Sequence, residues 1–189
     1  MSQFPIFTTD TAPADSKSAL QRSQRAFGFV PNLLGVLAGA PAALHAYLAL
    51  RQSFSSGTLT EVERQVVLLS VSREHACEYC MAAHSAIATS AGMPAEVLDA
   101  LRRGESLPDA RLETLRQTTQ ALVARRGWLP PEELERFLAS GYTSAQLLEV
   151  VTGIAQKTLS NYTNHLAQTP VDPQFESFAW SREQFAHTK

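Results

Sequence analysis

Helix start and stop signals recur along the chain and constrain its fold more than any other feature. Two segments, Thr60–Glu63 and Thr143–Gln146, have the capping-box pattern that satisfies the first backbone donors of a helix. Proline and glycine are found where helices begin and end, respectively. The prolines are Pro31, Pro41, Pro94, Pro108, Pro130 and Pro131, and the glycines are Gly28, Gly57, Gly92, Gly104 and Gly127. Short segments with these boundaries predict successive helices joined by turns.

Apolar residues between these signals recur at helical spacing, and no segment alternates as a strand would. We therefore expect helices over residues 15–28, 41–55, 60–75, 77–92, 94–104, 108–127, 130–140 and from 143 towards 170, with a short one after Pro31. They form one all-α domain over residues 1–189, a helical bundle whose core motif helices span about residues 60–92.

Both ends of the chain have distinct composition. Residues 1–14 are expected to form a loose N-terminal arm. Residues 170–189 form an aromatic C-terminal tail that contains Phe175, Phe178, Trp180 and Phe185. Large aromatic side chains seldom stay in water, so the tail docks either on its own core or on a neighbouring subunit.

Composition supports the helical class and excludes others. The chain has 27 Ala and 23 Leu but 11 Val and 3 Ile, a balance that favours helix over strand. A hydrophobic fraction of 44% excludes general disorder. The net charge of -2 gives no basic excess for nucleic acid.

Residues 26–50 contain no Asp, Glu, Lys or Arg, which raises the question of a membrane span. Pro31 and Pro41 interrupt this segment, so two buried helices of a globular core are the better interpretation. The N-terminus lacks a basic region followed by an apolar run. We expect a cytoplasmic protein without a membrane partner.

The most informative segment has the pattern Glu74-x2-Cys77-x2-Cys80-x3-His84. Residues three or four apart share one face of a helix, so the two thiols and the imidazole can meet. A helix N-terminus lowers a thiol pKa, and a nearby imidazole can accept the thiol proton. We expect Cys80 to attack, Cys77 to close a disulfide, His84 to relay protons and Glu74 to assist it.

Two other interpretations of this segment remain open. The two cysteines can be ordinary core residues. Alternatively, Cys77, Cys80, His84 and Glu74 can supply metal ligands, although structural zinc sites usually draw on two separated pairs. We expect neither a metal nor a cofactor.

At these residues the sequence resembles the alkyl hydroperoxidase D / carboxymuconolactone decarboxylase superfamily. The motif is embedded in LTEVERQVVLLSVSREHACEYCMAAHSAIATSAG, and residues 27–32 and 161–165 resemble its peroxidase-related branch. The resemblance implies an alkyl hydroperoxidase D-like helical fold that assembles as a dimer, trimer or hexamer. It also implies a thiol-dependent peroxidase that reduces hydrogen peroxide or organic hydroperoxides, with Cys80 attacking, Cys77 resolving and His84 as the relay histidine.

The chain departs from alkyl hydroperoxidase D proper at two positions. A relay glutamate precedes the first cysteine by twelve residues in that enzyme, whereas Gln65 stands there in this chain. Glu63 or Glu74 is expected to take the acidic role. Tyr79 replaces a histidine that adjoins the second cysteine. Carboxymuconolactone decarboxylases proper do not rely on a cysteine pair, so the pair favours redox chemistry.

Three further residues are candidates for substrate binding or proton relay: Tyr79, Asn164 and His165. The expected partners are a peroxide, an external thiol reductant or reductase, and further copies of the chain. A cofactor-independent decarboxylase or lactone-processing enzyme, and a non-enzymatic redox-sensing oligomer, are the alternative functions.

Overall fold

The computed structural model describes residues 3–185, which contain helices and no strand, so the expected all-α class is confirmed. No helix in this part of the chain has the length and apolar character needed to cross a membrane. The helices are α1 (Ala14–Phe27), α2 (Asn32–Leu37), α3 (Pro41–Ser55), α4 (Glu61–Glu74), α5 (Glu78–Ser90), α6 (Ala95–Arg103), α7 (Ala110–Ala124), α8 (Pro131–Ala139) and α9 (Ser144–Ala167), followed by the 3-10 helices η1 (Pro173–Phe178) and η2 (Glu183–Phe185).

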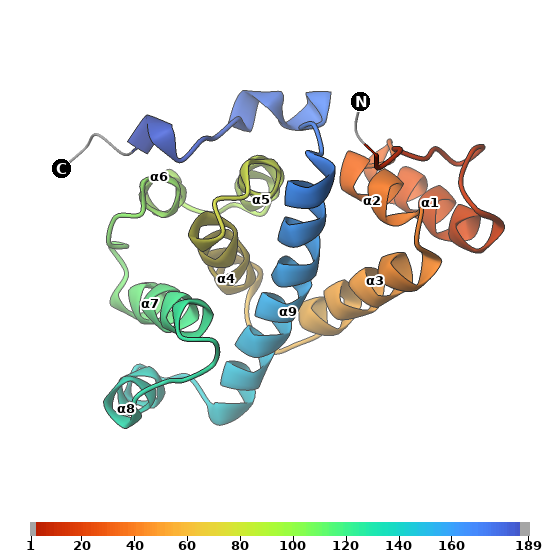
Figure 1. The fold of residues 1–189 in the computed structure, drawn as a ribbon. Helices are drawn as coiled ribbons and strands as arrows, with labels where there is room; N and C mark the ends of the chain where they lie inside the picture. Colours follow the sequence, from red (N-terminus) through yellow and green to blue (C-terminus); the bar gives the residue numbers. More distant parts are fainter. Residues whose placement is uncertain (1–2, 186–189) are drawn as a thin grey trace.

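The long helix α9 runs between two groups of helices (Figure 1). Helices α1, α2 and α3 lie on one side of it, and α4 to α8 lie on the other. Helix α4 packs against α5, α7 and α9, whereas α3 packs against α9. Helices from both groups therefore meet along α9, and the motif helices α4 and α5 lie at that junction.

Both predicted capping boxes are present. The side chain of Thr60 accepts from the backbone N–H of Glu63, and the Glu63 carboxylate accepts from the backbone N–H of Thr60 at 2.8 Å. Thr143 and Gln146 exchange the equivalent bonds at the start of α9. These reciprocal bonds satisfy donors that a helix start otherwise leaves unpaired, so both helices begin where expected.

Other helix boundaries differ slightly from expectation. Helix α1 begins at Ala14 behind Pro13, without a cap from Asp15. Helix α7 begins at Ala110 rather than at Pro108, because the Asp109 side chain caps it by accepting from the backbone N–H of Leu112 at 2.8 Å. A short polar side chain at a helix start thus determines the boundary more closely than the nearby proline.

The buried apolar residues form two clusters. The larger one lies among α4 to α9 and includes Val66, Leu69, Leu115, Phe137 and Trp180. The second joins α1, α2 and α3 to the start of α5, and it contains both cysteines. The thiols are therefore held inside a packed interior rather than on a surface loop.

The N-terminal residues do not form a loose arm, which corrects that expectation for residues 3–13. The backbone N–H of Phe7 donates to the carbonyl of Gly35 at 3.0 Å, and the Phe7 side chain packs against the second cluster. Gly35 permits this approach, because an added Cβ would lie 2.8 Å from the Phe7 carbonyl oxygen.

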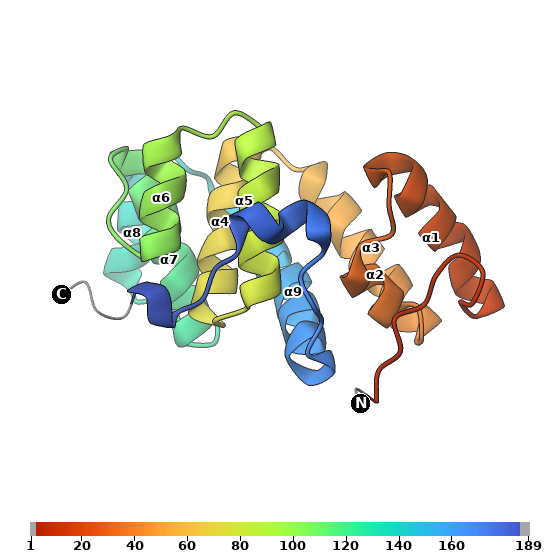
Figure 2. The same ribbon diagram turned by 90° about the horizontal axis from the view of Figure 1, so that it is seen from above.

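The C-terminal segment over residues 170–185, which we call the strap, crosses α5 and reaches α6 (Figure 2). The indole of Trp180 is 3% exposed and donates to the carbonyl of Arg102 at 2.9 Å. The Arg102 guanidinium in turn donates to the carbonyls of Phe178 and Ala179. Of the two docking alternatives, this tail therefore packs on its own core; the Phe185 side chain and residues 186–189 lie outside the described part of the chain.

Candidate active site

A tight turn between α4 and α5 places the two cysteines. Ala76 adopts φ 55°, a left-handed conformation that is uncommon outside glycine, and the backbone N–H of Cys77 donates to the carbonyl of Ser72 at 2.9 Å. Cys77 is then the N-cap residue of α5, and Cys80 lies in its first turn. Unpaired backbone donors at this helix start favour negative charge on a nearby thiol.

Side chains from α9 contact the thiols. The Nδ2 of Asn164 donates to Cys80 Sγ at 3.3 Å and lies 3.8 Å from Cys77 Sγ. Cys80 Sγ lies 3.8 Å from the Ser160 hydroxyl. Both cysteines are 1% exposed and carry free thiols. Asn164, expected near the site, thus lies directly at the cysteine pair.

Lys157 on α9 provides a buried positive charge beside Cys80. Its side chain is fully buried, and its Nζ has no hydrogen-bonding oxygen or nitrogen partner in the described chain. Burial acts to lower the Lys157 pKa, but the negative charges of Cys80, Tyr47 and Cys77 together outweigh it, so the pKa is raised. Lys157 therefore stays cationic and stabilises a Cys80 thiolate.

The two thiols differ in acidity. Burial acts to raise the pKa of Cys80, but its hydrogen bond with Cys77 and the charge of Lys157 outweigh burial, so the pKa lies well below the ordinary value. The same hydrogen bond, together with burial, raises the pKa of Cys77. Of the two side chains, Cys80 therefore favours the thiolate and Cys77 the thiol. That Cys80 attacks and Cys77 resolves stays a prediction.

A hydrogen-bonded chain orients His84. Gln65 Nε2 donates to Glu61 Oε1 at 2.7 Å, and the ring nitrogen Nδ1 of His84 lies 2.9 Å from Gln65 Oε1. Because the Glu61 carboxylate only accepts, it holds the amide of Gln65 with the oxygen towards His84. The His84 Nδ1 must then carry the proton, which leaves Nε2 as a free acceptor.

His84 is also kept neutral. Burial, followed by the positive charges of Lys157 and Arg51, holds its pKa well below the ordinary value. A neutral imidazole with a free Nε2 is the form that accepts a proton. The site thus contains a thiolate held by a cation and a neutral base.

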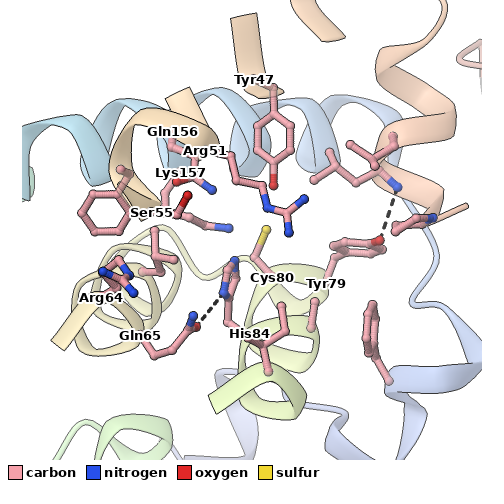
Figure 3. A pocket seen from close by; sticks show the side chains of 18 of the residues that line it. Tyr47, Arg51, Ser55, Arg64, Gln65, Tyr79, Cys80, His84, Gln156 and Lys157 are labelled. Carbon is pink, nitrogen blue, oxygen red and sulfur yellow. Dashed lines mark hydrogen bonds between the residues drawn. The ribbon is translucent and has the colours of Figure 1, made fainter. Parts of the chain in front are cut away.

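A cavity of about 200 Å³ opens onto Cys80 and His84. Figure 3 shows the two side chains next to each other, with Arg51, Tyr47 and Lys157 around the sulfur. Apolar side chains form much of the remaining wall: Phe27, Leu33, Leu34, Phe54, Ile87 and Phe175. A small organic molecule can therefore reach the thiolate of Cys80 from this cavity.

The two carboxylates expected to assist His84 lie elsewhere. Glu74 is the last residue of α4 and does not line the cavity; the partner of His84 is Gln65 instead. Glu63 forms the capping box and an ion pair with Arg111 at 2.5 Å. Both assignments to the relay are therefore corrected, because helix geometry turns position 65, not 63, towards α5.

Tyr79 and His165 also differ from their expected roles. The hydroxyl of Tyr79 donates to Asp172 Oδ2 at 2.5 Å and accepts from the backbone N–H of Leu33 at 3.3 Å. It is therefore unavailable to donate to a bound peroxide and instead attaches α5 to the strap. His165 is exposed and lines a separate surface pocket that also contains Cys77.

Sequence reasoning missed Lys157 and noted Gln65 only as a departure from a family pattern. The spacing of twelve residues before Cys77 was the signal for Gln65. No local spacing links Lys157 to Cys80, since the two residues are far apart in the chain. No group of three or more His, Cys, Asp or Glu residues in the described part of the chain has a geometry suited to a metal ion.

Part of the chain matches a known protein family. Residues 41–122, which include the cysteine motif, match the carboxymuconolactone decarboxylase family. No curated protein sequence matches the chain.

Several solved structures share the fold. An uncharacterized peroxidase-related protein with an alkylhydroperoxidase AhpD core, from Ralstonia eutropha JMP134, has a TM-score of 0.83 and 22% identity, covering 92% of this chain and 94% of its own. A peroxidase-related protein from Silicibacter sp. TM1040 has a TM-score of 0.78 and 18% identity, with 92% of each chain covered. A debrominase in complex with 2,3,4-tribromopyrrole has a TM-score of 0.77 and 14% identity, covering 94% and 97%.

Proposed function

We propose that the chain is a thiol-dependent peroxidase of the alkyl hydroperoxidase D / carboxymuconolactone decarboxylase superfamily, whose decarboxylase family model matches residues 41–122 and whose peroxidase-related structures share its fold. Its substrates are hydrogen peroxide or organic hydroperoxides. The observation that carries the proposal is the position of Cys80. It lies beside buried Lys157 and neutral His84, in a cavity whose wall is largely apolar.

The first step is attack by the Cys80 thiolate on the terminal oxygen of the hydroperoxide. The O–O bond breaks, Cys80 becomes a sulfenic acid, and the substrate leaves as an alkoxide that takes up a proton to form an alcohol. Lys157 stabilises the thiolate before attack, and Asn164 orients the sulfur through its 3.3 Å contact.

His84 moves the proton in this step. Because the resting site contains a Cys80 thiolate and a neutral imidazole, the proton comes from a water molecule: the free Nε2 accepts it as the alkoxide forms, and the imidazolium passes it to the departing alkoxide. Gln65 holds the ring so that Nδ1 keeps its own proton throughout. The relay therefore uses a neutral amide where a carboxylate was expected.

Cys77 completes the oxidation. Its thiol attacks the sulfenic acid of Cys80, which releases water and forms a Cys77–Cys80 disulfide. An external dithiol then reduces the disulfide. It attacks Cys77 preferentially, because Cys80 has the lower pKa and is the better leaving group. We place this cycle in the reducing cytoplasm.

Peroxide consumption with a dithiol reductant tests the proposal. The parent protein is expected to turn over, and Cys80→Ser is expected to abolish turnover. Retained consumption in Cys80→Ser would contradict the mechanism. Activity on a lactone or a carboxylate that survives replacement of both cysteines by serine would instead identify a decarboxylase-type enzyme, and cysteine oxidation without turnover would identify a sensor.

We also propose that copies of the chain associate. An apolar stripe runs along the outer face of α9, with Leu148, Val151, Tyr162 and Leu166 exposed by 70%, 47%, 53% and 72%. Their spacing places them on one side of the helix, and a second copy of the same stripe would remove both from water. Light scattering is expected to show an oligomer that Leu148→Lys weakens.

A further inference from the structure

The cavity that opens onto Cys80 is lined by a cationic side chain to which the proposed chemistry assigns no role. Three cationic side chains line this cavity: Arg51, Arg64 and Lys157. Arg64 forms an ion pair with Glu61 at 2.8 Å, and Lys157 stabilises the Cys80 thiolate. Arg51 forms no ion pair or hydrogen bond with the described part of the chain, so its charge is available to a ligand.

Packing holds the Arg51 guanidinium at the cavity. Its Cζ lies 4.9 Å from the centre of the Phe27 ring, which is a cation–π contact. Figure 3 shows the guanidinium directed inwards, between the Tyr47 hydroxyl and Cys80. Stacking uses the face of the guanidinium and leaves its N–H edge free, the geometry with which arginine binds a carboxylate through two parallel hydrogen bonds.

The surrounding charge favours an anion. Among residues 3–185, the one carboxylate that lines the cavity is Glu61, which already pairs with Arg64 and accepts from Gln65. The Cys80 thiolate offsets Lys157 and leaves the charge of Arg51 uncompensated. That charge also contributes to the lowered pKa of His84, which places the Arg51 guanidinium within electrostatic reach of the cavity's inner end.

From this arrangement we infer that Arg51 is a specificity-determining residue that binds the carboxylate of an organic hydroperoxide, while the apolar wall holds its hydrocarbon. The inference rests on the proposed peroxidase function and names its substrate class. The cavity volume of about 200 Å³ lies below the range for drug-sized ligands, which favours a compact aryl or short alkyl acid.

The redox step is the one already described. The Cys80 thiolate takes the terminal oxygen of the carboxylated hydroperoxide, and the substrate leaves as the corresponding hydroxy acid. Cys77 then closes the disulfide with loss of water, and an external dithiol restores both thiols. Arg51 takes no part in bond making; it fixes the far end of the substrate so that the hydroperoxide lies at Cys80.

Matched substrates test the inference. We compare cumene hydroperoxide with its meta- and para-carboxylates in the parent, Arg51→Met, Arg51→Lys and the control Arg25→Met. Arg25 is exposed on α1 and does not line the cavity. Arg51→Met is expected to lower kcat/KM for the better carboxylate roughly 10- to 100-fold, mainly through KM, and to change the neutral substrate less than about 3-fold.

Arg51→Lys is expected to recover part of this loss, because it keeps the charge but not the paired hydrogen bonds. Arg25→Met is expected to match the parent. An equal loss for neutral and carboxylated hydroperoxides in Arg51→Met would overturn the inference, since Arg51 would then act on the reacting atoms. Thermal unfolding of each variant checks that it is folded.

A binding measurement separates this inference from the proposed peroxidase activity. Calorimetry compares cumyl alcohol with its carboxylated forms, which need no redox turnover. Tighter binding of a carboxylated alcohol that is lost in Arg51→Met supports the anion site. If the same protein reduces no hydroperoxide, the peroxidase proposal alone has failed. Equal binding of neutral and carboxylated alcohols contradicts the inference.

Discussion

The ring nitrogen Nδ1 of His84 lies 2.9 Å from Oε1 of Gln65. This single contact determines which ring nitrogen is protonated, because Glu61 fixes the orientation of the amide from its other end. A carboxylate at position 65 would attract a proton to the imidazole, whereas the amide leaves the imidazole neutral. The choice of glutamine therefore sets the acidity of the His84 ring as well as its orientation.

Gln65→Glu is expected to raise the pKa of His84, because a negative charge within hydrogen-bond distance favours the imidazolium. The rise should be roughly one unit or more. NMR titration of the His84 ring measures it directly. Gln65→Leu, which removes the hydrogen bond without adding charge, serves as the comparison. An unchanged His84 titration in Gln65→Glu would show that the two side chains do not interact in solution.

Lys157→Met is expected to raise the pKa of Cys80, because it removes the buried cation that stabilises the thiolate. Alkylation by iodoacetamide in a Cys77→Ser background reports Cys80 alone, and the serine hydroxyl keeps a donor beside it. The rate at pH 6 should fall roughly 10-fold or more, since each pKa unit changes the thiolate fraction tenfold. Lys17→Met, an exposed lysine on α1, should leave the rate unchanged.

His84 should make the protein less stable in acid. Its pKa is lower in the folded chain than the unfolded value of about 6.5, so the unfolded chain binds more protons below that value. Its contribution is therefore fully present above pH 6.5 and is lost at about 1.4 kcal/mol per pH unit as the pH falls towards the folded pKa.

Urea unfolding of the parent and His84→Asn between pH 7 and pH 5 measures this contribution by difference. The variant should lose less stability than the parent over that range. Identical pH dependence in the two proteins would mean that His84 is not kept neutral by the fold.

Tyr79→Phe is expected to lower the free energy of unfolding by about 2 kcal/mol, because it removes a buried hydrogen bond to the Asp172 carboxylate. Urea denaturation measures the change. Ser90→Ala is the control, since Ser90 is exposed and its hydroxyl donates only to the carbonyl of Ala86 within α5. Equal stability of the two variants would show that Tyr79 does not hold the strap onto α5.

Local signals predicted the elements of this fold well. The capping boxes at Thr60 and Thr143 gave correct helix starts, because capping depends on residues three positions apart. Spacing also indicated that the two cysteines and His84 lie near one another; Cys77 is the N-cap residue of α5, and Cys80 and His84 lie within that helix. The N-terminal segment was not, because its docking through Phe7 depends on Gly35 in another element.

The electrostatic partners at the site depend on contacts between helices, which local spacing does not show. Lys157 reaches Cys80 from α9, and Asp172 reaches Tyr79 from the strap. Gln65 reaches His84 from α4, where the sequence also offered Glu63. The choice between positions 63 and 65 needed the relative rotation of α4 and α5, which packing determines.

Oxidation by a single equivalent of cumene hydroperoxide tests the central claim most directly. When the reduced protein has been treated in this way, peptide mass mapping is predicted to show loss of both thiols and one Cys77–Cys80 disulfide per chain. The Cys77→Ser variant is predicted to accumulate a sulfenic acid on Cys80 that dimedone traps. Consumption of the peroxide with Cys80 still a free thiol would contradict the account.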